Sequence, residues 1–301
     1  MRDTFRQLIP DALHAVGAST ETYLNQLNDH EPTQGSIARN ELDSRYGGSE
    51  PPGDVGLAHS FSYITIGITS DCLRAAGRLL DPRNPPANRY AISPVLRTSL
   101  ETSGLLFWLA RHDVAPRERL VRALRLAEYS RRMRAKSDSY FSAPGDTEYL
   151  EAIRRNVRAI AGRFKLKGLS NQIRENSDIS IPTSSDLIRK QFEEVTPETF
   201  TDALALYGRL SEPTHGNILG TLAGYEQATD HENPRAWLVP KIPLVDIAAG
   251  AHYAAEALSH SGATYFQLIG WTQKAGPPIS KLRAMLSCVL QRKPLPWRLS
   301  R

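Results

Sequence analysis

The stretch Ser93-Pro-Val-Leu-Arg-Thr-Ser-Leu-Glu-Thr-Ser-Gly-Leu-Leu-Phe-Trp-Leu109 decides the fold class. Ser93 is a favourable N-cap residue and Pro94 suits a first helical turn, so a helix is expected to begin here. The apolar residues from Leu105 to Leu109 go nearly all the way round that helix. Such a pattern is typical of a buried helix. We therefore expect the helix over 93–109 to lie at the centre of the fold.

Apolar periodicity predicts further helices on both sides of this one. Within residues 55–80 the β-branched run from Tyr63 to Thr69 also suits a strand, but the length of the pattern favours a helix. Residues 168–182 are polar and are expected to be irregular. The other predicted helices cover 2–30, 116–137, 146–166, 184–194, 196–210 and 245–261, with weaker patterns at 264–273 and 278–291. The sequence therefore predicts an all-α fold, an irregular helical bundle.

One change of composition divides the chain. Residues 31–54 are rich in proline and glycine and have few apolar residues, which indicates a flexible linker. The predicted organisation is an N-terminal helix at 1–30, this linker at 31–54, a main helical domain at 55–292 and a tail at 293–301.

Composition excludes several classes of protein. The 301 residues are 41% hydrophobic and 23% charged, with a net charge of +5, as in an ordinary globular protein. No run reaches the roughly 18 apolar residues that span a bilayer, so we expect a cytoplasmic protein with no membrane partner. Cys72 and Cys288 are too few for a disulfide framework and are expected to be buried free thiols. The hallmark loops of nucleotide-hydrolysing, dinucleotide-binding, serine-hydrolase and zinc-protease sites are missing, and no cofactor is expected.

The stretch from Tyr207 to Gly216 comes nearest to a chemical motif. Arg209 and His215 are separated by five residues. A histidine can move the proton of a ribose hydroxyl while an arginine holds the phosphate. The structural alternative, which we favour, is a helix C-terminus at which His215 and Gly216 serve as cap and turn residues. Chance alone predicts about two such Arg–His spacings in a sequence with 29 Arg and 8 His.

This spacing resembles the Arg-x(4–6)-His signature of the HEPN superfamily, all-α domains that include metal-independent ribonucleases. The sequence departs from that signature at Leu210, where the family usually has a polar residue, and at Pro213. In that family two copies commonly meet to make one site. The resemblance therefore implies catalysis by His215 and Arg209, a homodimer, and RNA or another phosphate-bearing ligand.

A second resemblance covers about residues 55–260. The sequence is similar there to a set of uncharacterised actinobacterial all-α proteins. The shared pattern is Arg97-x-x-x-Glu101 to Trp108-Leu109, followed by Glu118-Arg119 and the later Tyr207-x-x-x-Ser211-x-x-x-His215-Gly216. This resemblance implies a HEPN-like arrangement in which Arg97, Glu101 and His215 face a common cavity. Taken with the motif at 207–216, the candidate binding residues are Arg97, Glu101, Ser211 and Tyr207.

The residues themselves permit a less specific interpretation of each polar pattern. Arg97 and Glu101 are one helical turn apart and suit a structural ion pair as well as a phosphate site. The arginines of 116–137 are expected to form a solvated basic face, although such a face could follow a phosphate backbone. His252, Glu256 and His260 recur every four residues and indicate a polar helix face more than a metal site; no metal is expected.

Two functions remain open from the sequence. The first, which we prefer, is a helical binding or scaffold module whose polar groups serve the fold. The second is a HEPN-like ribonuclease in which His215 is the acid and base, Arg209 and Arg97 hold phosphate, and Glu101 orients them.

Overall fold

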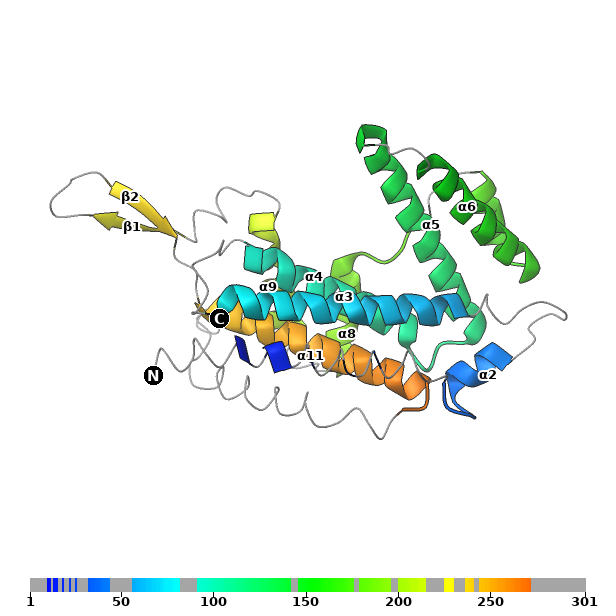
Figure 1. Ribbon diagram of the computed structural model, residues 1–301, viewed down its shortest axis with the longest axis horizontal. Coiled ribbons are helices and arrows are strands. Elements are labelled where there is room, and N and C mark those ends of the chain that lie inside the picture. The colour runs from blue at the N-terminus through cyan, green and yellow to red at the C-terminus, as the bar shows by residue number, and fades with distance from the viewer. Residues whose placement is uncertain are drawn as a thin grey trace.

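The computed structural model describes residues 10, 11, 13–15, 18, 22, 25, 32–43, 56–81, 91–141, 146–175, 179–195, 200–214, 225–229, 236–240 and 244–271. These residues form an all-α bundle, as predicted (Figure 1). A small antiparallel hairpin, which the sequence did not lead us to expect, is added to the bundle. Its strands are β1 (Tyr225–Thr229) and β2 (Ala236–Pro240), with Gln227 opposite Leu238.

Helix α4 (Ile92–Ala110) is the centre of the bundle, as its apolar surface predicts. It packs against α3 (Gly56–Leu80), α8 (Ser184–Val195), α9 (Phe200–Thr214) and α11 (Leu244–Leu268). We call these five helices the body. The start of α4 differs from the prediction, because Ala91 occupies the N-cap position without a side-chain hydrogen bond and Ser93 already lies inside the helix.

Two apolar clusters lie along α4. Leu96 and Leu100 belong to the larger one, which includes buried residues of α3, α8, α9 and α11. Leu106 belongs to the second, with Ile66 of α3 and Phe266 of α11. Neighbours on several sides bury Leu106, Phe107 and Leu109 and leave Leu105 and Trp108 partly buried, which explains why apolar residues surround the second half of α4.

Three helices form an arm that projects from the body in Figure 1: α5 (Pro116–Phe141), α6 (Asp146–Arg163) and α7 (Lys167–Arg174). The arm has its own core, which includes Leu124 of α5 and Val157 of α6. Helix α7 lies where we expected irregular chain, so the prediction for 168–182 is wrong up to Arg174, whereas residues 179–182 form neither helix nor strand. Leu169 and Ile173 are four residues apart and both buried in the arm core, which stabilises a helix in a largely polar segment.

Part of the predicted linker also departs from expectation. Residues 37–43 form helix α2 (Ile37–Asp43), and Ala38 is buried in the second cluster of the body. Ser36 caps this helix, because its hydroxyl accepts a hydrogen bond from the Arg39 amide at 3.1 Å. The Thr33 amide donates to the Ile269 carbonyl at 3.0 Å and holds the chain before α2 against the end of α11.

The remaining predicted elements divide between confirmed helices and residues outside the described part. Helices α3, α5, α6, α8 and α9 confirm the corresponding predictions, and α11 runs on to Leu268 through the start of the weaker pattern at 264–273. Of the predicted N-terminal helix, only the eight positions named above are described, and Leu13 is buried in the larger cluster of the body. Residues 278–291 and the tail at 293–301 lie outside the described residues.

Glycine at position 104 allows α4 and α8 to approach closely. A Cβ added at Gly104 would lie 3.1 Å from the Leu187 Cβ and 3.3 Å from the Ile188 backbone nitrogen. We predict that Gly104→Leu destabilises the protein by about 1–3 kcal/mol or more, because the larger side chain must push α8 away from α4. Urea denaturation monitored by circular dichroism measures this change.

Gly162→Leu is the matched control. Gly162 also lies in a helix, but its added Cβ would meet nothing within 4 Å. This change should leave stability equal or raise it by about 0.5–1 kcal/mol, because glycine disfavours helix. Equal effects of the two substitutions would contradict the packing role of Gly104.

Candidate functional site

Three of the predicted site residues come together between α4 and α9. Arg97 Nε donates to Glu101 Oε1 at 2.9 Å within α4. The Tyr207 hydroxyl, from α9, donates to the same carboxylate oxygen at 2.7 Å. Arg97 Nη2 lies 3.5 Å from the Tyr207 hydroxyl, and the guanidinium carbon lies 5.5 Å from the centre of the tyrosine ring. We call Arg97, Glu101 and Tyr207 the polar triad.

Arg97 and Tyr207 are both favoured in their protonated forms within the polar triad. Burial lowers the pKa of Arg97, but the hydrogen bond with Tyr207 and the attraction of Glu101 outweigh this, and the pKa lies above its ordinary value. Burial and the hydrogen bond to Glu101 both raise the pKa of Tyr207. The arrangement therefore favours a charged guanidinium and a neutral phenol. It holds α9 against α4.

Two other predicted site residues, Ser211 and Arg209, are described and lie outside the polar triad. The Ser211 hydroxyl donates to the Tyr207 carbonyl of its own helix at 2.8 Å. Arg209 is exposed, and two residues of α-helix place it about 200° around α9 from the buried Tyr207. His215 lies outside the described residues, so the predicted pairing of His215 with Arg209, and the cavity shared with Arg97 and Glu101, remain predictions.

The arginines of α5 are less exposed than the sequence suggested. We expected Arg119, Arg122, Arg125 and Arg132 to lie on a solvated basic face. Arg125 is exposed, but Arg119 is buried and the side chains of Arg122 and Arg132 are only 17% and 15% exposed. The predicted face is wrong for these three arginines because the helix packs against the body and the other arm helices on more than one side.

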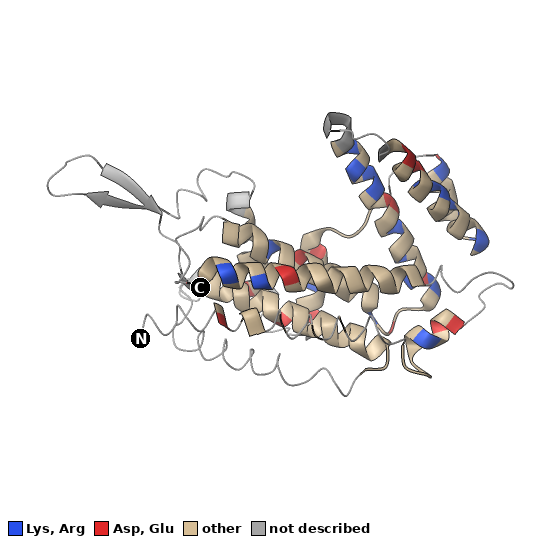
Figure 2. Cartoon of the chain, in the orientation of Figure 1, with Lys and Arg blue, Asp and Glu red and all other residues tan. Residues whose placement is uncertain are grey.

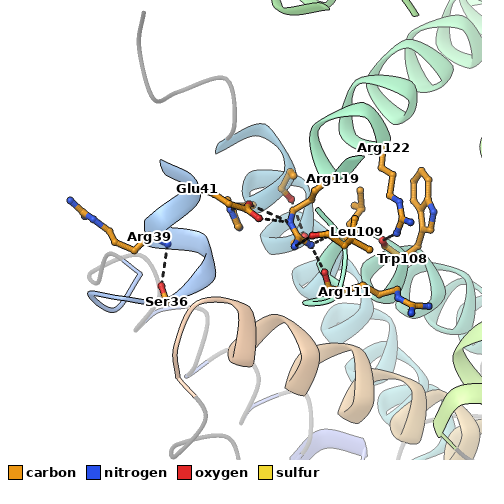
Figure 3. Close-up of polar contacts among 12 residues, drawn as sticks. Ser36, Arg39, Glu41, Trp108, Leu109, Arg111, Arg119 and Arg122 are labelled. Atoms are coloured by element: carbon orange, nitrogen blue, oxygen red, sulfur yellow. Dashed lines mark hydrogen bonds and ion pairs between the residues drawn. The ribbon is translucent and has the colours of Figure 1, made fainter. Parts of the chain in front are cut away.

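Arg119 is the most deeply buried of them, at 1% exposure, and it joins three parts of the chain (Figure 3). Its Nε donates to Glu41 of α2, which is 2% exposed, at 3.2 Å. Its Nη1 donates to the carbonyls of Leu109 and Arg111 at the end of α4, at 3.0 and 2.6 Å. Its Nη2 donates to the Val114 carbonyl at 3.0 Å. We call Arg119 and Glu41, with these carbonyls, the arm latch.

The environment of the arm latch is strongly desolvated. Burial lowers the pKa of Arg119, and the attraction of Glu41 opposes that effect. His59 of α3 is also buried, with its Nε2 3.3 Å from Glu41 Oε2, so a second basic group faces the same carboxylate. The latch thereby connects α2, α3, the end of α4 and the arm.

The arm latch could not be predicted from the sequence, because its members are far apart in the chain. Glu41 and Arg119 are separated by 78 residues, and no spacing rule connects them. The sequence does contain a local signal for the helix that carries Glu41. Ser36 followed by Ile37, Ala38 and Leu42 is an N-cap before a short amphipathic run, which predicts a helix inside the linker.

Two further sets of arginines in the arm and at its base make contacts within the protein. Glu128 is fully buried and accepts hydrogen bonds from Arg131 at 2.8 Å and from Arg132 at 2.9 Å. Burial raises the pKa of Glu128, but these bonds outweigh it and the pKa is lowered. Arg122 lies over the Trp108 ring at 5.3 Å and donates to the Trp108 carbonyl. Much of the basic charge that Figure 2 shows on α5 is therefore paired inside the fold.

The histidine and glutamate repeat of α11 is not an exposed polar face. Glu256 is buried, with His252 Nε2 at 3.4 Å and His260 Nε2 at 3.9 Å from its carboxylate oxygens. The three residues therefore share a polar helix face, as expected, but its central carboxylate lies in the interior. Within the residues that the structure describes, no group of three or more His, Cys, Asp or Glu side chains is placed to hold a metal ion.

Comparison with known proteins adds no assignment to this geometry. The sequence matches no family model, and no match was found among curated proteins or among solved structures.

Arg119 tests the arm latch. Arg119→Met should destabilise the protein by about 3–5 kcal/mol, because it leaves the buried Glu41 carboxylate without its charged partner. Arg125→Met, at an exposed position on the same helix, should change stability by no more than about 0.5 kcal/mol. Adding Glu41→Gln to Arg119→Met should recover part of the loss. Urea denaturation gives all three values, and equal costs for the two single substitutions would refute the latch.

Tyr207 tests the polar triad through pH. The pKa of Tyr207 in the folded protein is raised above its ordinary value of about 10. The contribution of its hydroxyl to the free energy of unfolding is therefore complete below about pH 10 and is lost as pH rises through the folded pKa. Tyr207→Phe should cost about 1.5 kcal/mol at pH 7, because Glu101 loses a hydrogen bond.

The difference in unfolding free energy between the wild type and Tyr207→Phe should then shrink as pH rises above about 10. Urea denaturation at a series of pH values measures it. Tyr149→Phe, at a side chain that is 57% exposed, controls for the loss of a hydroxyl as such. A difference that grows with pH would contradict the arrangement.

Proposed function

We propose that the protein is a non-enzymatic helical scaffold, a binding module whose ionic groups hold its own helices in place. The observation that carries this proposal is the arm latch. A buried arginine that bonds a carboxylate and three backbone carbonyls supports a fixed junction between arm and body.

The polar triad supports the same proposal. Each charged group of the triad has its partner within the triad, in an arrangement that joins α4 to α9. A catalytic arginine is expected to present its donors to a substrate. A guanidinium that donates to Glu101 and lies over the Tyr207 ring suits a structural role better.

The arm also argues for a scaffold over an RNA-cleaving enzyme. Phosphate-binding surfaces use arginines whose donors reach solvent. On α5 the donors of Arg119 and Arg131 form hydrogen bonds with groups of the protein, and Arg122 lies over the Trp108 ring.

None of the helices in the described part is both long and apolar enough to cross a bilayer.

Cleavage of RNA in the presence of EDTA tests the proposal against the ribonuclease alternative. The purified full chain is incubated with a mixed-sequence labelled RNA, beside His215→Ala and Arg209→Ala. We predict no cleavage by the wild type above that of either variant. His215 is included because the resemblance assigns it the proton transfer. Cleavage by the wild type that both variants lose, with their circular dichroism spectra unchanged, would overturn the scaffold proposal.

A further inference from the structure

The outer face of α3 carries an apolar stripe along its whole length. With 100° of rotation per residue, seven positions fall within an arc of about 80°. They are Leu57, Phe61, Ile64, Ile68, Cys72, Ala75 and Leu79. We call them the α3 stripe. In Figure 1, α3 lies in front of α4, and the first fifteen residues of the helix, 56–70, contain no Asp, Glu, Lys or Arg.

Exposure in the α3 stripe is greatest near its middle. Ile64 is 52% exposed and Ile68 is 44% exposed, whereas the other five members are partly buried. Leu57 packs against the arm core at one end, and Leu79 packs against the body core at the other. The protein thus presents two neighbouring isoleucines to solvent, one helical turn apart, between anchored ends. Isoleucine is among the residues most often buried in proteins.

The order of positions in the α3 stripe is the same in both directions. Counting outward from Ile68, Ile64 and Cys72 are each four residues away, Phe61 and Ala75 are seven, and Leu57 and Leu79 are eleven. A two-fold axis pairs a surface with a second copy of itself, so the surface must be complementary to its own reversed copy. Two antiparallel α3 helices related by an axis through Ile68 would meet this condition, with Ile68 opposite Ile68 and Ile64 opposite Cys72.

The shape of the surface fits the same pairing. A hollow of about 490 Å³ lies on the C-terminal half of α3, and the described residues that line it are Asp71, Arg74, Ala75, Arg78 and Leu79. In the antiparallel pairing, Ala75 of one copy lies opposite Phe61 of the other. The ring of Phe61 would therefore meet a small side chain that lines the hollow, as a knob fits into a hole between packed helices.

Charge does not oppose this contact. The charged residues of α3 are Asp71, Arg74 and Arg78. In the antiparallel register they lie opposite the rows of Thr65, Ser62 and Ala58, so no like charges face one another. A parallel arrangement would instead place each of the three charges beside its own copy, where like charges repel.

We infer that α3 is a self-association surface, and that its partner is a second copy of this chain in an antiparallel arrangement with its two-fold axis at Ile68. This inference rests on the proposed scaffold function and names its partner.

Sedimentation of the full chain over a range of concentrations tests the surface. The wild type should show a monomer–dimer equilibrium. Ile64→Glu with Ile68→Glu should raise the dissociation constant at least about tenfold, because it brings two carboxylates per copy into an apolar contact. Tyr149→Glu is the matched control, since it replaces an equally exposed apolar side chain on the arm. It should leave the equilibrium unchanged. A monomer at every concentration, or a dimer insensitive to the double substitution, would overturn the inference.

Cross-linking tests the register. In a background of Cys72→Ser and Cys288→Ser, Ile68→Cys should form a disulfide-linked dimer under mild oxidation, because the two-fold axis brings the two copies of residue 68 together. Ser60→Cys in the same background should not, because its two copies would be about 24 Å apart in the antiparallel register. Linkage of Ser60→Cys as efficient as that of Ile68→Cys would refute the antiparallel register.

The two proposals fail in different ways. A monomeric protein that cleaves no RNA would end the inference about α3 and leave the scaffold proposal standing. RNA cleavage that depends on His215 and Arg209 would end the scaffold proposal, whatever the state of association.

Discussion

The arrangement of arm and body depends on one side chain that has almost no access to water. A guanidinium has five N–H donors and no acceptor, so a buried arginine destabilises the fold unless the protein supplies oxygens around it. For Arg119 these come from Glu41 of α2, from the last carbonyls of α4 and from the loop that leads into α5. The end of α4 would otherwise expose those carbonyls without partners. One residue thus ends the central helix, sets the start of the arm and holds α2 in place.

The same use of arginine recurs on a smaller scale elsewhere in the fold. Glu128 is buried between Arg131 and Arg132 of its own helix, and Glu101 is held by Arg97 and by the Tyr207 hydroxyl. In each case a carboxylate receives hydrogen bonds from two side chains, and for the fully buried Glu128 these bonds offset its desolvation. A high arginine content therefore has a structural explanation in this chain. Part of the charge that a sequence count assigns to the surface is paired inside the fold, at Arg119 and Arg131.

Helical spacing in the sequence predicts some contacts of the site but not others. The pair of Arg97 and Glu101 was predictable, because four residues of helix bring two side chains together. Tyr207 could be named only from its neighbours in a motif, and its contact with Glu101, 106 residues away in the chain, follows from the packing of α9 on α4. Arg209, two residues further on, carried the stronger chemical expectation. The helical repeat turns it to the opposite side of α9, away from the polar triad.

The sequence by itself determined the helices and the identity of the central one. A helix with apolar residues nearly all round 105–109 needs neighbouring elements on several sides to keep these side chains from water. This requirement can be inferred from the local sequence alone. Helices α2 and α7 are too short and too polar to be stable alone, and only their packing against the body and the arm decides that they form. Tertiary structure likewise decided the role of the arginines of α5. A helical repeat shows which side chains share a face, but the direction in which that face points depends on neighbours that come from distant parts of the chain.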